Sequence, residues 1–106
     1  MVAARTARWL DIETANTWSS TVALNSADIR GMVDFFTGRS VTVGIYSTGF
    51  QWNQITGGLS VGVPNWLAGA SSTTQAVNWC KTASSFSGGR VAMVQYTSTF
   101  DNDVAC

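Results

Sequence analysis

Short apolar segments rich in β-branched and aromatic residues alternate with segments of helical spacing, and this alternation constrains the fold more than any other feature. Strands that alternate with helices favour parallel pairing through right-handed crossovers, so we expect an α/β fold with four parallel strands. The four predicted strands span 7–13, 41–47, 65–70 and 91–97. The three predicted helices span 25–39, 50–55 and 73–80.

The first and third predicted helices carry clear boundary signals. In the first, apolar residues recur on one helical face, and these are Ile29, Met32, Val33 and Phe36. We expect Asn25 to cap its start, with Asp28 in the first turn, and Gly38 to end it. The third helix is opened by Ser72, with Gln75 three residues later in a capping-box pattern.

The length and composition predict one structural unit, 1–106, with a sparsely charged surface. Of its 106 residues, 45% are hydrophobic, which favours a packed core over disorder. Only 11% are charged, well below the usual share of about 25%. The surface is therefore either covered by Ser, Thr, Gly and Asn or partly hidden by a partner.

The charge pattern excludes several classes of function. Six basic and six acidic side chains give zero net charge, and no basic run offers a footprint for nucleic acid or an anionic membrane surface. No apolar stretch of about 18 residues is present for a membrane span. The chain has no histidine, so imidazole-dependent triads and metal sites are excluded, and we expect neither metal nor cofactor. Acid–base chemistry must depend on carboxylates.

The two cysteines suggest an oxidising compartment. A disulfide between Cys80 and Cys106 would tie down the C-terminal residue and close a loop of about 25 residues. Two unrelated buried thiols are the alternative. Because disulfides persist outside the cytosol, we expect a secreted, extracellular protein. No signal peptide is predicted, since the segment 1–8 lacks the necessary apolar run.

Asp11 and Glu13 are the candidate catalytic residues. They lie two positions apart on a predicted strand, so both side chains leave one face with Cα atoms about 6–7 Å apart. Paired carboxylates raise one another's pKa, which keeps one protonated while the other is ionised. Glycoside hydrolysis needs this division of labour. The alternative is structural, with the acids capping the next helix or pairing with an arginine.

Further polar and aromatic residues follow the other predicted strands. Parallel α/β folds bind their ligands at the carboxyl ends of the strands, where four strand ends should converge. The candidate substrate-binding residues at these ends are Tyr46 on the second strand and Gln95 and Tyr96 on the fourth. The tryptophans are either core residues or sugar-stacking platforms. The segment 101–103, rich in Asp and Asn, is also typical of a turn.

An ordered set of motifs resembles the later strands of the glycoside hydrolase family 25 lysozymes and their actinobacterial relatives. The motifs are WLDIE (9–13), VGIYS (43–47), NWLA (65–68), VQY (94–96) and FDND (100–103). The resemblance implies a (β/α)8-like barrel that cleaves the β-1,4 bond between N-acetylmuramic acid and N-acetylglucosamine in peptidoglycan. It implies Glu13 as proton donor and Asp11 as the acid that stabilises charge or positions the substrate. Tyr46 and Trp66 would help to form the groove, and Asp101 or Asp103 would complete the acidic site.

The resemblance covers only the C-terminal half of such a barrel. Nothing in the chain corresponds to the family's earlier strands, and four parallel strands cannot close a barrel that usually has eight. Exposed strand edges pair readily with another chain. We therefore expect self-association, as a dimer that rebuilds a barrel or through the edge of a small doubly wound sheet.

Three functions remain open on the sequence alone. The first is a peptidoglycan glycosidase or its remnant, based on the acid pair and the resemblance. The second is a carbohydrate-binding module that keeps the groove aromatics without catalysis. The third is a structural half-barrel that folds by oligomerising and has no activity of its own.

Overall fold

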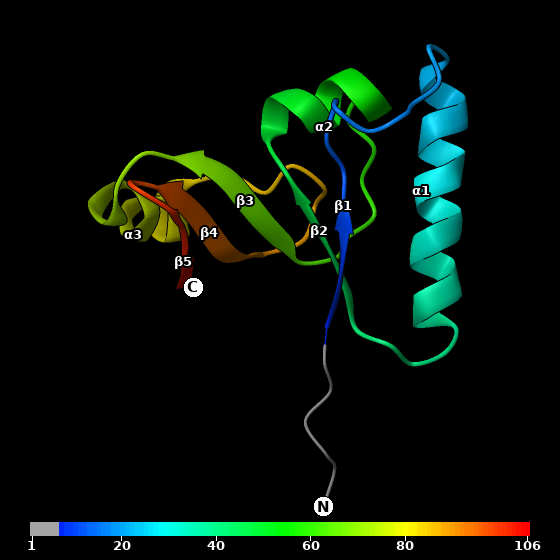
Figure 1. Ribbon diagram of the computed structural model, residues 1–106. Coiled ribbons are helices and arrows are strands. Elements are labelled where there is room, and N and C mark those ends of the chain that lie inside the picture. The colour runs from blue at the N-terminus through cyan, green and yellow to red at the C-terminus, as the bar shows by residue number, and fades with distance from the viewer. Residues whose placement is uncertain (1–6) are drawn as a thin grey trace, which may run out of the picture.

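The computed structural model describes residues 7–106 and shows an α/β architecture (Figure 1). Strands and helices alternate as the sequence predicts. One additional strand follows at the C-terminus. The elements are β1 (Arg8–Asp11), α1 (Val22–Thr37), β2 (Val43–Ser47), α2 (Gly49–Thr56), β3 (Asn65–Ala70), α3 (Thr73–Thr82), β4 (Val91–Thr97) and β5 (Asp101–Ala105). The α/β prediction is thus confirmed.

All five strands form one sheet, in the order β1-β2-β3-β4-β5. The first four pair in parallel, as expected, and β5 runs antiparallel to β4. The four-strand prediction was therefore one strand short, and the expected turn at Asp101–Asp103 is instead the start of β5. Asp103 is paired with Gln95 and Asp101 with Thr97 in the antiparallel ladder, so β4 and β5 form a hairpin.

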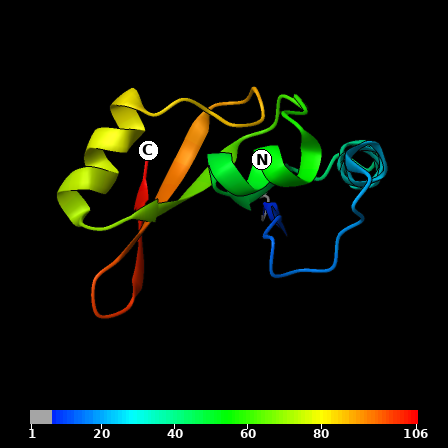
Figure 2. The same cartoon turned by 90° about the horizontal axis from the view of Figure 1, so that it is seen from above.

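The helices cover one face of the sheet and leave the other open. Figure 2 shows α2 and α3 on the same side of the strands, with α1 beyond β1. One core cluster joins β2 to α1 and α2 through Ile45, Ile29 and Trp52, all fully buried. A second cluster joins β3 and β4 to α3, with Ala76 and Val94 fully buried. Because side chains alternate along a strand, every second residue faces away from this core.

Helix boundaries agree with the predictions except at the start of α1. Thr21 occupies the N-cap position of α1, four residues before the predicted Asn25, while Gly38 ends the helix as expected. Asn25 is instead buried, and its side-chain amide donates to the carbonyl oxygens of Ser19 and Ile55. An Asn that can satisfy its amide through tertiary contacts does not need to cap a helix. Ser72 caps α3 by accepting the Gln75 N–H, as predicted, but the Gln75 side chain accepts the N–H of Ser71 rather than that of Ser72, so the reciprocal bond of a capping box is shifted by one residue.

A disulfide joins Cys80 on α3 to the terminal Cys106, with Cα atoms 5.3 Å apart. This confirms the bridge and excludes two unrelated thiols. The backbone N–H of Cys106 also donates to the carbonyl oxygen of Ala92 on β4, so both the disulfide and this hydrogen bond hold Cys106 in place. In the part of the chain that the structure describes, no helix is long and apolar enough to cross a membrane.

Candidate functional site

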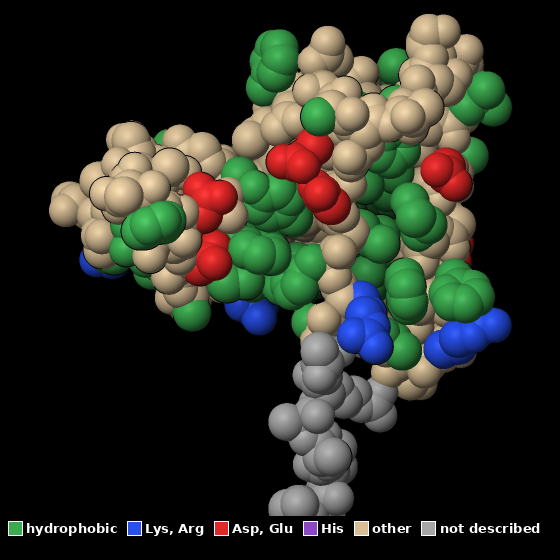
Figure 3. Space-filling model, viewed as in Figure 1, with side chains coloured by type: hydrophobic (Ala, Val, Ile, Leu, Met, Phe, Trp, Pro, Cys, Tyr) green, Lys and Arg blue, Asp and Glu red, His purple; other side chains and the backbone are tan. Residues whose placement is uncertain are grey.

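The open face of the sheet carries a pocket at its centre. The pocket has a volume of about 210 Å³ and is lined by Trp9, Asp11, Tyr46, Trp66 and Gln95, which come from four neighbouring strands. Figure 3 views this face and shows two groups of acidic side chains over the sheet, with hydrophobic side chains between them, and further acidic atoms apart from them over α1. The two groups belong to opposite edges of the sheet, β1 and β5.

Three aromatic rings form the floor of this pocket. The Trp66 ring lies between Trp9 and Tyr46, with centroids 5.7 Å and 4.9 Å away and edge-to-face geometry in both pairs. Gly44 makes room for this arrangement, because a Cβ there would overlap the Trp9 ring and lie 2.8 Å from the carbonyl oxygen of Pro64. These rings are therefore packed against one another in fixed positions, with their outer surfaces toward the open face.

Asp11 lines one edge of the pocket, and Glu13 follows two residues later in the chain. Strand β1 ends at Asp11, so Glu13 lies just beyond the strand rather than on it, but the two side chains still meet. Partial burial, then a side-chain hydrogen bond with Asp11, then the Asp11 charge raise the pKa of Glu13 above its ordinary value. Neither acid stands at the N-cap position of α1, which is Thr21. The raised pKa keeps Glu13 protonated to a higher pH than an ordinary glutamate carboxyl group.

Tyr46 stands between the two acidic groups. Burial raises the pKa of its hydroxyl, and the charges of four carboxylates raise it further, namely Glu13, Asp11, Asp101 and Asp103. Four of the chain's six acids thus act electrostatically on one phenol, although 88 residues or more separate the two pairs along the chain. The Tyr46 hydroxyl donates to Gln95 Oε1 at 2.6 Å, which fixes the ring in the pocket.

The residues predicted near the C-terminus divide into three groups. Asp103 belongs to the site, because its Oδ1 accepts the Trp66 indole N–H at 2.7 Å. Asp101 lies farther along the hairpin, where its carboxylate accepts the Thr97 hydroxyl at 2.8 Å. Tyr96 packs against the second core cluster, so the structure does not bring it to the pocket with Gln95. Adjacent residues on a strand face opposite sides, which separates Tyr96 from Gln95.

The backbone that carries the acid pair is held by side chains that the sequence reasoning missed. The buried Ser47 hydroxyl donates to the Ile12 carbonyl oxygen at 2.6 Å, and Gln51 Oε1 accepts the backbone N–H of Thr14 at 2.8 Å. The carbonyl oxygens of Asp11 and Glu13 accept from two further side chains, Asn16 Nδ2 and Trp18 Nε1, each at 2.9 Å.

These side-chain hydrogen bonds clamp the backbone of the acid pair, and so fix the positions of the carboxylates before a ligand binds. The acids at positions 11 and 13 therefore project from a segment whose carbonyl groups are already satisfied. In the sequence, these hydrogen bonds are indicated only by the cluster of short polar residues after the first two strands. Among residues 7–106, no group of three or more Cys, Asp or Glu side chains is arranged to hold a metal ion.

Comparison with known proteins supplies a family. The family model described as Lysozyme-like protein 1 matches residues 3–88, which include the acid pair, Tyr46 and Trp66. No curated protein and no solved structure matches the chain significantly. Because the family match spans most of the sequence, this chain belongs to the lysozyme-like protein 1 family.

Proposed function

We propose that the open-face pocket is the site of a glycoside hydrolase that cleaves the β-1,4 bond between N-acetylmuramic acid and N-acetylglucosamine in peptidoglycan. The proposal includes kinship with the family 25 lysozymes of the actinobacterial type. It depends above all on one observation: Asp11 lines a pocket floored by aromatic rings, and its interaction with the nearby Glu13 carboxyl group helps to raise the Glu13 pKa. Membership of the lysozyme-like family supports it.

Each residue has a distinct role in the proposed reaction. Glu13 donates its proton to the glycosidic oxygen, and the bond from that oxygen to the anomeric carbon breaks. The ionised Asp11 stabilises the positive charge that develops on the anomeric carbon and ring oxygen. A water molecule then adds its hydroxide to this carbon, and its proton returns to Glu13. Only carboxyl groups and water are needed, which agrees with a chain that has no histidine.

The pocket also fits the shape of a sugar. The packed rings of Trp9, Tyr46 and Trp66 offer apolar surface to the C–H face of a pyranose. Gln95 and Asp103 lie at the rim and can accept hydroxyl or amide hydrogens. Through these contacts the open-face pocket would hold the glycan across the strands, with the scissile bond near Glu13.

The decisive assay is the release of soluble muropeptides from purified bacterial cell walls. We expect release by the unmutated chain and its loss in Glu13→Gln, which keeps the shape of the side chain but cannot donate a carboxyl proton. Asp34→Asn is the matched control, because Asp34 is an exposed acid on α1, away from the pocket. No release by the unmutated chain would refute the catalytic proposal.

Glycan binding without catalysis is a second candidate function, favoured by the fixed aromatic floor. Calorimetric titration with chitin oligomers separates the two. Under this alternative, binding survives in Glu13→Gln and is lost in Trp66→Ala, while wall digestion is absent throughout. Release of muropeptides would contradict it.

We further propose that two copies of the chain associate as half-barrels. The sequential strand order is that of a singly wound barrel, whereas a doubly wound sheet reverses its order. Within residues 7–106, β1 has no strand on its outer edge, and beside that edge lies a groove of about 540 Å³. Leu10, Met32, Phe35 and Phe36 supply its apolar lining. A second copy would pair with the edge and fill the groove.

Light scattering at micromolar protein tests this association. We expect a dimer mass that falls on dilution, and a monomer in Phe35→Glu, because this half-exposed ring lies in the groove. Leu24→Glu is the control, since Leu24 is an exposed apolar residue of α1 outside the groove. A monomer mass at every concentration would refute the proposal.

We place the protein outside the cell. Peptidoglycan, the proposed substrate, is extracellular, and the Cys80–Cys106 disulfide is of a kind that persists in oxidising compartments. Secretion in a native host, followed by free-thiol labelling of the recovered protein, tests this. Recovery only from the cytosol, with both thiols reduced, would contradict it.

A further inference from the structure

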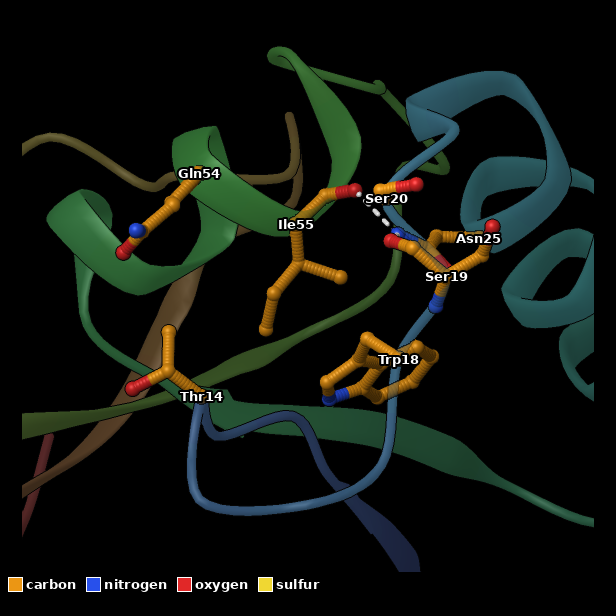
Figure 4. A pocket seen from close by; sticks show the side chains of 7 residues that line it. All are labelled: Thr14, Trp18, Ser19, Ser20, Asn25, Gln54 and Ile55. Atoms are coloured by element: carbon orange, nitrogen blue, oxygen red, sulfur yellow. Dashed lines mark hydrogen bonds between the residues drawn. The ribbon is translucent and has the colours of Figure 1, made fainter.

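A second pocket lies between α2 and the loop that joins β1 to α1. Figure 4 shows its lining, with Thr14 and Trp18 from the loop on one side and Gln54 and Ile55 from α2 on the other. Its volume is about 300 Å³, which lies at the small end of ligand sites and suits a single sugar ring. The catalytic proposal makes no use of this loop pocket.

Tertiary hydrogen bonds hold the walls of the loop pocket in place. The Asn25 amide donates to the carbonyl oxygens of Ser19 and Ile55, and so joins the loop to α2 (Figure 4). Trp18 donates its indole N–H to the Glu13 carbonyl oxygen, which leaves its ring rather than its nitrogen for a ligand. The pocket is therefore part of the folded framework and does not depend on a ligand to form it.

The groups that remain available define the chemistry of the ligand. Within the described residues, the Ser20 hydroxyl and the Gln54 amide have no hydrogen-bond partner, and both residues are exposed. Ile55 and the Trp18 ring contribute apolar surface beside them. No charged residue lines the pocket. Neutral donors and acceptors next to an apolar wall complement a neutral sugar and supply no positive charge to pair with a phosphate or a carboxylate.

The loop pocket is also close to the proposed catalytic pair. Thr14 lines it and directly follows Glu13, and Gln51 of α2 holds Thr14 through both its backbone N–H and its hydroxyl. We propose that the loop pocket binds a neutral N-acetylated pyranose, as an additional sugar site beside Glu13. The choice of an N-acetylated sugar rests on the proposed function, whereas the preference for a neutral sugar rests on the lining alone.

NMR titration of the unmutated, nitrogen-15-labelled chain with N-acetylglucosamine tests the site. A monosaccharide has no glycosidic bond to cleave, so the readout is independent of catalysis. We expect chemical-shift changes at the amides of Thr14, Ser20 and Ile55. Gln54→Ala should weaken this binding about five- to tenfold, the usual effect of one lost hydrogen bond.

Two controls make the result specific. Asn53→Ala changes the neighbouring exposed amide on α2, outside the pocket, and should leave the affinity unchanged. Glucose 6-phosphate, an anionic sugar, should leave the loop amides unshifted.

The outcomes separate this site from the proposed function. Loop-pocket shifts in a chain that releases no muropeptides would support the site and refute the catalytic proposal. Shifts confined to the surroundings of Tyr46 and Trp66 would overturn the loop site and leave the catalytic proposal standing. Absence of shifts at the loop amides at millimolar sugar, or an unchanged affinity in Gln54→Ala, would also overturn it.

Discussion

Replacing Ser47 by alanine should remove a buried contact on which both the fold and the acid pair depend. The side chain is fully buried at the end of β2, and its hydroxyl donates to the carbonyl oxygen of Ile12 at 2.6 Å. Ile12 is itself 1% exposed and lies between Asp11 and Glu13. In Ser47→Ala, water has no ready access to replace the lost donor.

The expected loss of stability follows from that burial. A buried carbonyl group left without a partner costs roughly 1–3 kcal/mol, so we expect the free energy of unfolding to fall by about 2 kcal/mol. For a domain of this size each kcal/mol shifts the Tm by about 4–8 °C, which gives a decrease of roughly 10 °C. Muropeptide release should fall as well, because the segment that holds Glu13 loses one of its fixed contacts.

Circular dichroism during urea and thermal unfolding measures both quantities. Ser98→Ala is the matched control, because Ser98 is exposed in the β4–β5 turn, and its change should stay within about 0.5 kcal/mol. If Ser47→Ala unfolds at the same Tm and urea midpoint as the unmutated chain, the hydroxyl does not support Ile12 and the argument for a clamped acid pair fails.

Three further predictions concern the bridge, the acid pair and the aromatic floor. Cys80→Ser should lower the free energy of unfolding by about 3.5 kcal/mol, because the bridge joins residues 26 positions apart. An unchanged midpoint of guanidinium unfolding would contradict this. Asp11→Asn should lower the Glu13 pKa, because the hydrogen bond and charge that raise it are lost while burial remains; carbon-13 NMR titration measures it. Because the Glu13 pKa is raised in the folded state, protonated Glu13 stabilises the fold at low pH, and this stability is lost as pH rises through the Glu13 pKa. The pH-dependent loss of stability should therefore be smaller in Asp11→Asn. Gly44→Ala should cost about 1–3 kcal/mol by displacing the Trp9 ring, and an unaltered Tm would refute the tight packing.

The sequence by itself determined the secondary structure closely wherever local chemistry decides it. The bounds of β3 and β4 agree with the predicted 65–70 and 91–97 because their apolar and β-branched runs are bounded by clear turn signals. Ser72 begins α3 as predicted, since its cap bond reaches only three residues ahead. The alternation of these elements was enough to predict parallel pairing of β1 to β4.

The sequence also identified most of the candidate site. Parallel strands bring their carboxyl ends to one edge, so Asp11 and Tyr46 were expected together without knowledge of the fold. The family model agrees with the resemblance at the level of lysozyme-like proteins. The two cysteines, one of them the last residue of the given sequence, favoured the disulfide that the structure contains.

Only the tertiary structure decided the features that depend on contacts between distant segments. Asn25 has the local chemistry of a helix cap, but partners on α2, 30 residues away, satisfy its amide. The segment that begins at Asp101 has the composition of a turn, but pairing with β4 makes it a strand. Ser47 gives no local sign that it holds Ile12. The physical reason is the same in each case: the free energy of a buried polar group depends on which partner the fold brings to it, and composition and spacing do not record that partner.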